Sequence, residues 1–390
     1  MPEAVLSADG PGHAGHARPL ISVVLPVYGV RDYLPACLDS LLGQPDAGTG
    51  RPWPDPAGQA IEVIAVDDAS PDGSGAVLDD RAGIDQRLTV IHLETNRGPG
   101  NARNVGLARA AGEYVWFVDG DDAIPSGAIA ELAAALERDR PDVLLIDYED
   151  RYPDGGTGPS PGTALLRSAP AGTFALADAP HLVGLTMTAW SKLFRREFLV
   201  GLREPFRAGI HEDIPVTCAA LLAGRLAVLD RVCYSYRRSR AGSFMATTSS
   251  THWGVFGAYA EVLDLVGKLS ESGDPVATPA VRQAIFERAI WHFTTVLQTT
   301  GLGIGPAGRP GLVPRSERRR FFEQMHADFL RYRPAGYRLP PGARGAKFRL
   351  IERDAYWTYE LLEPLNKLRV AAVRWLRGAA RKPRPTAPAS

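Results

Sequence analysis

Short apolar runs alternate with segments of helical periodicity along the first 150 residues. Runs rich in valine, isoleucine and leucine predict buried strands at 21–27, 61–66, 88–93, 114–118 and 143–147. Apolar residues three or four positions apart predict helices at 31–42, about 74–82, about 100–111 and 126–137. Because strands that alternate with helices form right-handed βαβ units, we expect an α/β fold with a mostly parallel sheet flanked by helices.

The periodic pattern weakens after residue 150. A stretch rich in glycine and proline, 153–172, leads into a mixed segment that ends near residue 245. Helical periodicity returns at 253–269 and 280–297, and further helices are predicted to about residue 380. We therefore expect a disordered lead, an α/β domain, a helical C-terminal region and a disordered tail, at residues 1–19, 20–245, 246–380 and 381–390.

The charges of the chain balance, with 44 lysines and arginines against 44 aspartates and glutamates. This balance lacks the overall positive charge of a nucleic-acid-binding protein, so we expect no nucleic-acid partner. The three cysteines, Cys37, Cys218 and Cys233, are too few and too scattered for a disulfide framework or a zinc site, and they fit a reducing compartment. With no signal-peptide core and no run of ~18 apolar residues, we expect a cytoplasmic protein.

Acidic residues gather at the ends of two predicted strands. Asp67 and Asp68 follow the strand at 61–66, and Asp119, Asp121 and Asp122 follow the strand at 114–118. In open α/β sheets, ligands bind beyond the carboxyl ends of the strands. Two carboxylates spaced D-x-D can share a hard divalent cation that substrate phosphates complete. The alternative is that aspartates simply favour turns.

Six blocks of the sequence resemble, in order, those of glycosyltransferase family 2. They are ISVVLPVYGVRDYLPACLDSLL, IEVIAVDDASPDGSG, NRGPGNARNVGLARAAGEYVWFVDGDD, WSKLF, HED and YSYRRSRAGS, and they cover roughly residues 20–245. The resemblance implies a GT-A (Rossmann-like) fold and an inverting transfer of a sugar from a nucleotide-diphosphate donor. It also implies Mn²⁺ or Mg²⁺ as a cofactor, and UDP as the family's commonest nucleotide.

The resemblance implies a role for each matching residue. The nucleotide would be bound by Pro26, Tyr28, Asp67, Asp68, Arg103, Asn104 and Asp119. The metal would be held by Asp119 and Asp121. Gly29 and Ser191 depart from the family, which commonly has asparagine at both positions.

The resemblance also implies the groups that perform the transfer. Asp213 would be the catalytic base with Glu212 as its companion, and Arg237 and Arg238 would bind the leaving diphosphate. The acceptor or sugar site would be lined by Trp190, Lys192 and Asp122. Simpler interpretations stay open: an acid favoured at a helix N-terminus for Asp213, a solvated basic run for the arginines and a core position for Trp190.

Residues 365–384 carry seven basic residues and no acid, with leucine and alanine on one helical face. Such a helix suits an anionic membrane surface, and the alternative is a terminal helix that docks on the body of the protein. The membrane interpretation would place the enzyme peripherally on the inner face of the cell membrane, acting on a glycan, teichoic acid or lipid-linked acceptor. A second hypothesis for the whole chain is a catalytically silent GT-A module that serves as a binding or scaffold subunit.

Overall fold

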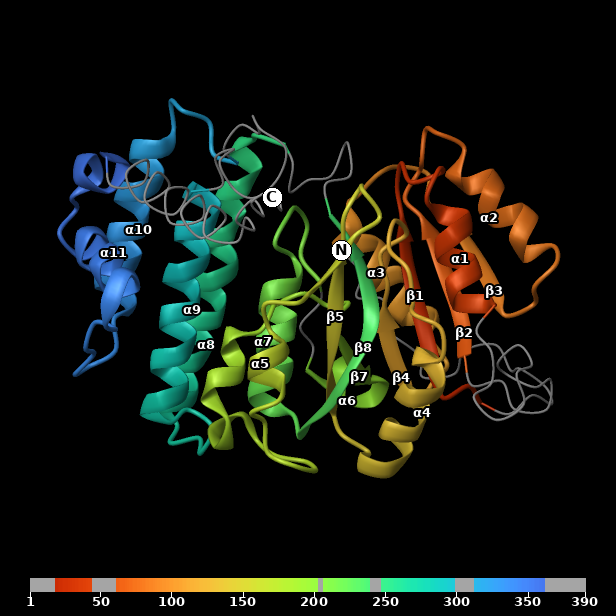
Figure 1. Ribbon diagram of the computed structural model, residues 1–390, viewed down its shortest axis with the longest axis horizontal. Coiled ribbons are helices and arrows are strands. Elements are labelled where there is room, and N and C mark those ends of the chain that lie inside the picture. The colour runs from red at the N-terminus through yellow and green to blue at the C-terminus, as the bar shows by residue number, and fades with distance from the viewer. Residues whose placement is uncertain (1–17, 44–60, 203–205, 239–246, 299–311, 362–390) are drawn as a thin grey trace, which may run out of the picture. The chain divides into compact units, whose positions relative to one another are not determined.

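The computed structural model describes residues 18–43, 61–202, 206–238, 247–298 and 312–361 (Figure 1). Contacts among these residues form two compact units: residues within 18–238 and 254–285 make up the first, and residues within 247–253 and 286–361 make up the second. This division differs from the predicted boundary at residue 245, because α8 (Gly254–Glu271) packs on α7 (Asp213–Ala223) in the first unit.

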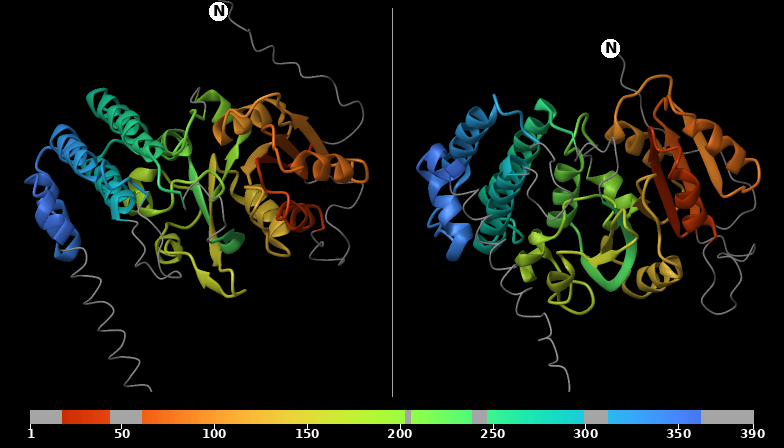
Figure 2. Two further views of the ribbon diagram at one scale, coloured as in Figure 1. Left: turned by 90° about the horizontal axis from the view of Figure 1, so that it is seen from above. Right: turned by 45° about the horizontal axis from the view of Figure 1, so that its top comes forward.

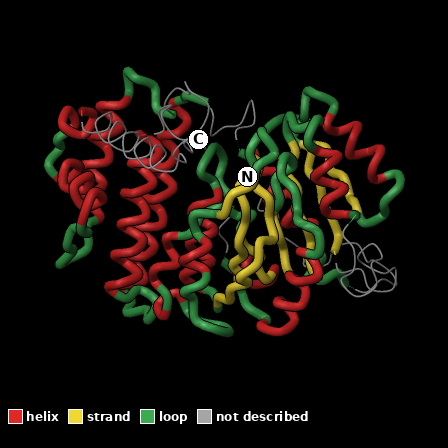
Figure 3. The backbone as a smooth tube through the Cα atoms, viewed as in Figure 1, coloured by secondary structure: helices red, strands yellow, loops and turns green. Residues whose placement is uncertain are grey.

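The first unit is built on a mixed sheet of eight strands among the described residues (Figure 3). Its parallel half has the order β3-β2-β1-β4 and consists of β1 (Ile21–Val27), β2 (Ile61–Asp67), β3 (Leu88–His92) and β4 (Tyr114–Phe117). Val27 pairs with Asp67, and Asp67 pairs with His92, so β1, β2 and β3 end at the same level. Phe117 at the end of β4 pairs with Val24 of β1, so the acids at the end of β2 and those after β4 lie at the same edge of the sheet.

The other half of the sheet mixes strand directions. β7 (Lys192–Arg195) runs antiparallel between β4 and β5 (Val143–Arg151). β8 (Leu226–Arg237) pairs in parallel with β5, with register shifts around Asp147, and β6 (Thr157–Pro159) pairs antiparallel with the end of β5. The five strands predicted from the sequence are all present, whereas β6, β7 and β8 lie in the segment where no pattern was recognised.

Helices cover both faces of the sheet (Figure 2). α1 (Leu34–Leu42), α2 (Ser74–Ala82) and α4 (Ala128–Asp139) share one apolar core with Val23 and Leu25 of β1. α3 (Pro99–Arg109) packs on β1 and β2, and a Cβ on its Gly106 would lie 2.4 Å from Cγ1 of Val24. The glycine thus lets helix and strand approach closely. Shorter helices complete this unit: α5 (Thr163–Leu166), η1 (Leu176–Asp178), η2 (Pro180–Gly184) and α6 (Arg196–Gly201).

The second unit is helical. It contains η4 (Ser250–Trp253), α10 (Arg318–Tyr332), α11 (Gly342–Glu352) and the later part of α9 (Pro279–Gln298). Phe286 of α9 makes edge-on ring contacts with Phe329 and Tyr337, at centroid distances of 5.2 and 4.9 Å. No helix in the described ranges is both long and apolar enough to cross a membrane. The predicted basic helix at 365–384, the tail and residues 1–17 of the lead lie outside the described residues.

Candidate active site

A buried tyrosine holds the turn that follows β4. The hydroxyl of Tyr234 accepts the backbone N–H of Asp119 at 3.1 Å and donates to Oδ2 of Asp122 at 2.7 Å. Oδ1 of Asp122 accepts the backbone N–H of Arg237 at 2.7 Å. Asp122 is 2% exposed, and burial together with Asp121 and Asp119 raises the pKa of its carboxyl well above its usual range. Asp122, predicted at the acceptor or sugar site, is thus placed where it supports the turn.

Arg103 connects this turn to a second acidic pair. Its Nη2 donates to Oδ1 of Asp119 at 2.9 Å, and its Nη1 donates to Oε1 of Glu212. The guanidinium also lies over the ring of Phe206, 5.7 Å from its centroid. Burial lowers the pKa of Arg103, but Asp119, Glu212 and Asp213 raise it more, so the side chain stays a cation. α3, the end of β4 and the start of α7 therefore meet at one guanidinium.

Asp213 is the first residue of α7, and Glu212 is the cap before it. The hydroxyl of Thr217 donates to the carbonyl of Asp213 at 2.6 Å and lies 3.2 Å from the carbonyl of Met187, which ties the first turn of the helix to the preceding loop. Burial and the neighbouring Glu212 raise the pKa of Asp213 to about 7, against the opposing effect of Arg103 and Lys192. A carboxyl with this pKa can both accept and release a proton near neutral pH.

Asp67 at the end of β2 and Asp68 after it are buried and hold neighbouring loops. Asp68 accepts the backbone N–H groups of Arg97 and Gly98, at 2.9 and 2.7 Å. Asp67 accepts the N–H of Ser70 at 3.0 Å, and its other oxygen lies 3.0 Å from Nδ1 of His92. In this arrangement, both acids fix the edge of the predicted nucleotide site.

The other residues predicted to bind the nucleotide differ in their exposure to solvent. Pro26 is buried in β1, whereas Tyr28, just beyond the end of that strand, is 44% exposed. The side-chain amide of Asn104 exchanges two hydrogen bonds with the backbone of Phe206, at 2.8 and 3.0 Å. Asn104 therefore holds the segment that leads to α7, while Tyr28 presents a ring to solvent.

The two arginines at the end of β8 have different partners. Nε of Arg237 donates to the carbonyl of Asp121 at 2.7 Å, and its guanidinium lies over the ring of Tyr33. Arg238 forms a two-pronged ion pair with Asp150, at 2.8 and 3.0 Å. Arg237 is thus directed to the turn after β4, whereas Arg238 is paired with an acid of β5.

Known proteins similar to this chain are glycosyltransferases. Residues 22–201 match the family model described as glycosyl transferase family 2. These residues belong to glycosyltransferase family 2. The uncharacterized glycosyltransferase EpsJ of Bacillus subtilis (strain 168) is 33% identical over 226 residues, which are 57% of this chain and 62% of EpsJ.

TarS is similar in both sequence and structure. The poly(ribitol-phosphate) beta-N-acetylglucosaminyltransferase TarS of Staphylococcus aureus (strain Mu50 / ATCC 700699) is 32% identical over 230 residues, 58% of this chain and 37% of TarS. The crystal structure of S. aureus TarS 1–349 in complex with UDP-GlcNAc has a TM-score of 0.65 at 23% identity, over 89% of this chain and 91% of that one. The predicted GT-A fold with a helical C-terminal region is confirmed by this match. The chain itself spans less than two thirds of EpsJ and of TarS.

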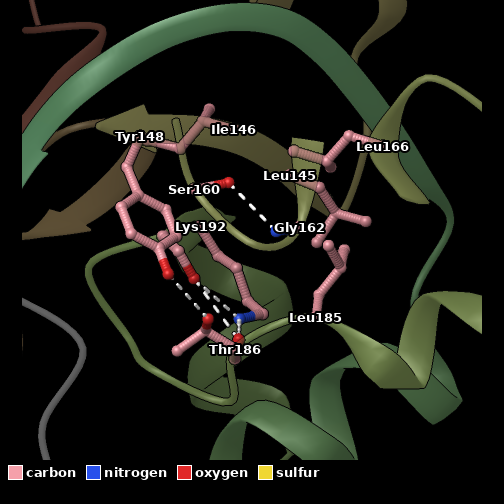
Figure 4. A pocket seen from close by; sticks show the side chains of 10 residues that line it. Leu145, Ile146, Tyr148, Ser160, Gly162, Leu166, Leu185, Thr186 and Lys192 are labelled. Carbon is pink, nitrogen blue, oxygen red and sulfur yellow. Dashed lines mark hydrogen bonds between the residues drawn. The ribbon is translucent and has the colours of Figure 1, made fainter. Parts of the chain in front are cut away.

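Two residues of the family 2 block WSKLF lie inside the protein. Trp190 stacks between Tyr234 and Tyr236, with centroid distances of 4.5 and 5.2 Å. Lys192 is 1% exposed, and its Nζ donates to the carbonyl of Thr186 at 2.7 Å (Figure 4) and to that of Thr188 at 3.0 Å. In Figure 4 its side chain reaches from β7 to the loop that carries Thr186. Both residues, predicted at the acceptor or sugar site, are buried and make these contacts within the protein.

The family implies a divalent cation, and the acids of the turn after β4 are the residues that could bind it. Asp119 and Asp121 supply carboxylate oxygens, the ligands that Mg²⁺ and Mn²⁺ prefer. Within the described residues, no group of three aspartates, glutamates, histidines or cysteines is placed to hold a metal ion. The two acids therefore fit a cation that takes its other ligands from a diphosphate and from water.

Several residues with a part in this site were not singled out from the sequence. Tyr234 supports the turn, His92 contacts Asp67, and Phe206 lies beneath Arg103. The alternation in YSYRR could have indicated Tyr234, because residues two apart in a strand share a face. His92 lies near the end of the strand predicted at 88–93, and Asp67 directly follows the strand predicted at 61–66, so their proximity could have been expected from neighbouring parallel strands.

Proposed function

We propose that this chain is an inverting glycosyltransferase of cell-envelope biosynthesis. It moves a hexosyl or N-acetylhexosaminyl group from a nucleotide diphosphate to a hydroxyl of a glycan, teichoic acid or lipid-linked acceptor. The observation that carries the proposal is the Arg103 bridge, which brings the acidic turn after β4 to Glu212 and thus beside Asp213. A UDP-sugar is favoured as the donor because the TarS structure of similar fold is a complex with UDP-GlcNAc.

In the proposed reaction, the acceptor hydroxyl attacks the anomeric carbon on the side opposite the diphosphate. The new carbon–oxygen bond forms as the bond to the diphosphate breaks, and Asp213 accepts the hydroxyl proton on a carboxylate oxygen. General-base catalysis of this kind accelerates a reaction typically ~10²–10⁴-fold. Asp213 is suited to it because a pKa of about 7 leaves it largely ionised just above neutral pH and basic enough to take the proton.

Charge on the departing diphosphate needs positive partners. Arg237 lies beside Asp121, so its guanidinium can approach a diphosphate bound at the turn. Arg238 could do so only by leaving Asp150. A divalent cation held by Asp119 and Asp121 would neutralise further charge on the diphosphate.

A catalytically silent GT-A module remains the alternative. It is favoured by the pairing of Arg238 with Asp150 and of Asp68 with two backbone N–H groups, because these partners occupy groups that the donor would otherwise use. The enzyme hypothesis accounts better for the pKa of Asp213, since a scaffold has no need for a carboxyl that titrates near neutral pH.

The test is release of nucleotide from UDP-, GDP-, dTDP- and CDP-sugars, with Mn²⁺, Mg²⁺ or EDTA, in the presence and absence of envelope glycan acceptors. We expect release from one nucleotide class, mainly UDP, that depends on the cation. Absence of release with every donor, combined with donor binding by calorimetry, would establish the silent module instead.

A further inference from the structure

We propose that Arg103, which the family resemblance assigns to nucleotide binding, is a positioning residue that fixes Asp119 and Glu212 on one guanidinium and so holds the base Asp213 beside the donor site. This inference rests on the proposed function for the identity of the base. It gives Arg103 a different task from contact with the nucleotide.

The contacts of Arg103 favour this task. Its side chain is only 6% exposed, and its two terminal nitrogens point to different elements: Nη2 to Asp119 after β4, and Nη1 to Glu212 before α7. The guanidinium carbon lies over the ring of Phe206, 5.7 Å from its centroid. An arginine that bound a nucleotide would present a nitrogen to the site, whereas both terminal nitrogens here are used within the protein.

The surroundings of Arg103 position the same segment independently of its charge. Gly100 lies one turn earlier on α3, and a Cβ there would be 2.1 Å from the carbonyl oxygen of Arg207 and 3.1 Å from Cγ of Glu212. Asn104, the next residue of the helix, binds the backbone of Phe206 through two hydrogen bonds. α3 therefore contacts the segment before α7 through Gly100, Arg103 and Asn104, and of these three side chains only that of Arg103 is charged.

That charge acts on Asp213 together with three others. Glu212 and Asp119 raise the pKa of Asp213, and Arg103 and Lys192 lower it. Removal of the Arg103 charge would raise the pKa of the base further, so the base would be protonated at neutral pH. Removal of the Glu212 charge would lower the pKa of Asp213.

The experiment compares the pH dependence of kcat/KM for the wild-type chain, Arg103→Met, Arg103→Lys and Glu212→Gln. We expect the acidic limb to move upward by roughly one pH unit in Arg103→Met and downward in Glu212→Gln, as loss of a nearby opposite or like charge requires. Arg103→Lys keeps the charge but lacks the two-pronged fork, so its limb stays in place while kcat falls. Arg167→Met is the matched control, because Arg167 and its partner Asp230 form an exposed ion pair elsewhere in the first unit.

A second measurement separates this inference from the proposed function. The pKa of Asp213 can be measured by carbon-detected NMR of its carboxyl in the same four proteins, whether or not they transfer a sugar. Opposite shifts in Arg103→Met and Glu212→Gln support the bridge, and absent or parallel shifts overturn it. If Arg103→Met does not fold, the other two variants still test the bridge. The bridge requires that the pKa of Asp213 is lower in Glu212→Gln and unchanged in Arg103→Lys.

Discussion

The hydroxyl of Tyr234 lies 2.7 Å from Oδ2 of Asp122 and 3.1 Å from the backbone nitrogen of Asp119, so one phenol holds both ends of the acidic turn. Tyr234 is fully buried in the apolar core, and burial and the charge of Asp122 raise its pKa well above the ordinary value. The hydroxyl therefore stays protonated and remains a donor to Asp122. Crowding of three carboxylates in the turn is tolerated because Tyr234 and the N–H of Arg237 satisfy Asp122.

Replacement of Tyr234 by phenylalanine should destabilise the protein. The change leaves the N–H of Asp119 and Oδ2 of Asp122 without this partner, and a buried unsatisfied group costs about 1–3 kcal/mol. Urea denaturation of the wild-type and Tyr234→Phe proteins measures the difference. Tyr152→Phe is the control, because Tyr152 is 41% exposed and should change the unfolding free energy little. Equal destabilisation by the two variants would contradict the role of Tyr234.

Most of the α/β core could be predicted from the sequence. β1, β2 and β4 are apolar runs because they are buried inside the sheet, whereas β3 is its edge strand and buries mainly Leu88, with Val90 and Ile91 half-buried. β7 was missed because it has four residues with a charge at each end, KLFR, and its Lys192 is buried by hydrogen bonds with loop carbonyls. β8 was missed because its middle, Asp230–Val232, is exposed and its register with β5 shifts.

Without the family resemblance, the pattern of residues along the chain predicts only the acids of the site. Their position after parallel strands placed them at one edge, and the structure has them there. Their partners could not be predicted, because Arg103 and Glu212 are 109 residues apart and no local pattern joins them. The two hydrogen bonds between the amide of Asn104 and the backbone of Phe206 join residues 102 positions apart, so no local pattern predicts them either.

Replacement of Asp213 by asparagine should remove the base without removing the fold. Because the folded pKa is about 7, the base is protonated below that pH and ionised above it, so wild-type kcat/KM should rise through pH 7. Asp213→Asn should lower kcat by ~10²-fold or more and abolish this rise, with donor affinity kept within a few-fold. Initial rates from pH 5.5 to 9 and calorimetric titration with UDP measure both. A variant that retained the acidic limb would show that another group is the base.

His92 should make stability depend on pH. Hydrogen bonds with Asp79 and Asp67 raise its pKa, against burial, so the charged ring is favoured in the folded state. Because the pKa of His92 is higher in the folded than in the unfolded state, the protonated ring stabilises the fold fully at pH values below the unfolded pKa of about 6.5. This stabilisation is lost as the pH rises through the folded pKa. His92→Gln should therefore lower Tm more at pH 5.5 than at pH 8.5. His181→Gln is the control, since His181 is exposed and its Nε2 lies 2.9 Å from the hydroxyl of the exposed Ser168. Equal losses of Tm at both pH values in His92→Gln would contradict the prediction.

Residues 365–384, which lie outside the described part of the chain, should contact an anionic membrane. Their seven basic residues each add ~1 kcal/mol of attraction near an anionic bilayer, and the leucines of the same stretch can enter its interface. A full-length variant with these seven residues changed to glutamine keeps the apolar face and removes the charge. We expect the wild-type chain to sediment with vesicles that contain phosphatidylglycerol, and the variant to stay in the supernatant.

Vesicles of phosphatidylcholine alone control for attraction that does not depend on charge, and 0.5 M salt should release the wild-type chain because screening shortens the reach of its charges. The same variant should keep its nucleotide release from a sugar donor with a water-soluble acceptor, since the acids and arginines of the proposed site lie in the first unit. If the wild-type chain stayed in the supernatant as the variant does, the stretch would instead be a helix docked on the protein, and the acceptor would be sought among polymers free in solution.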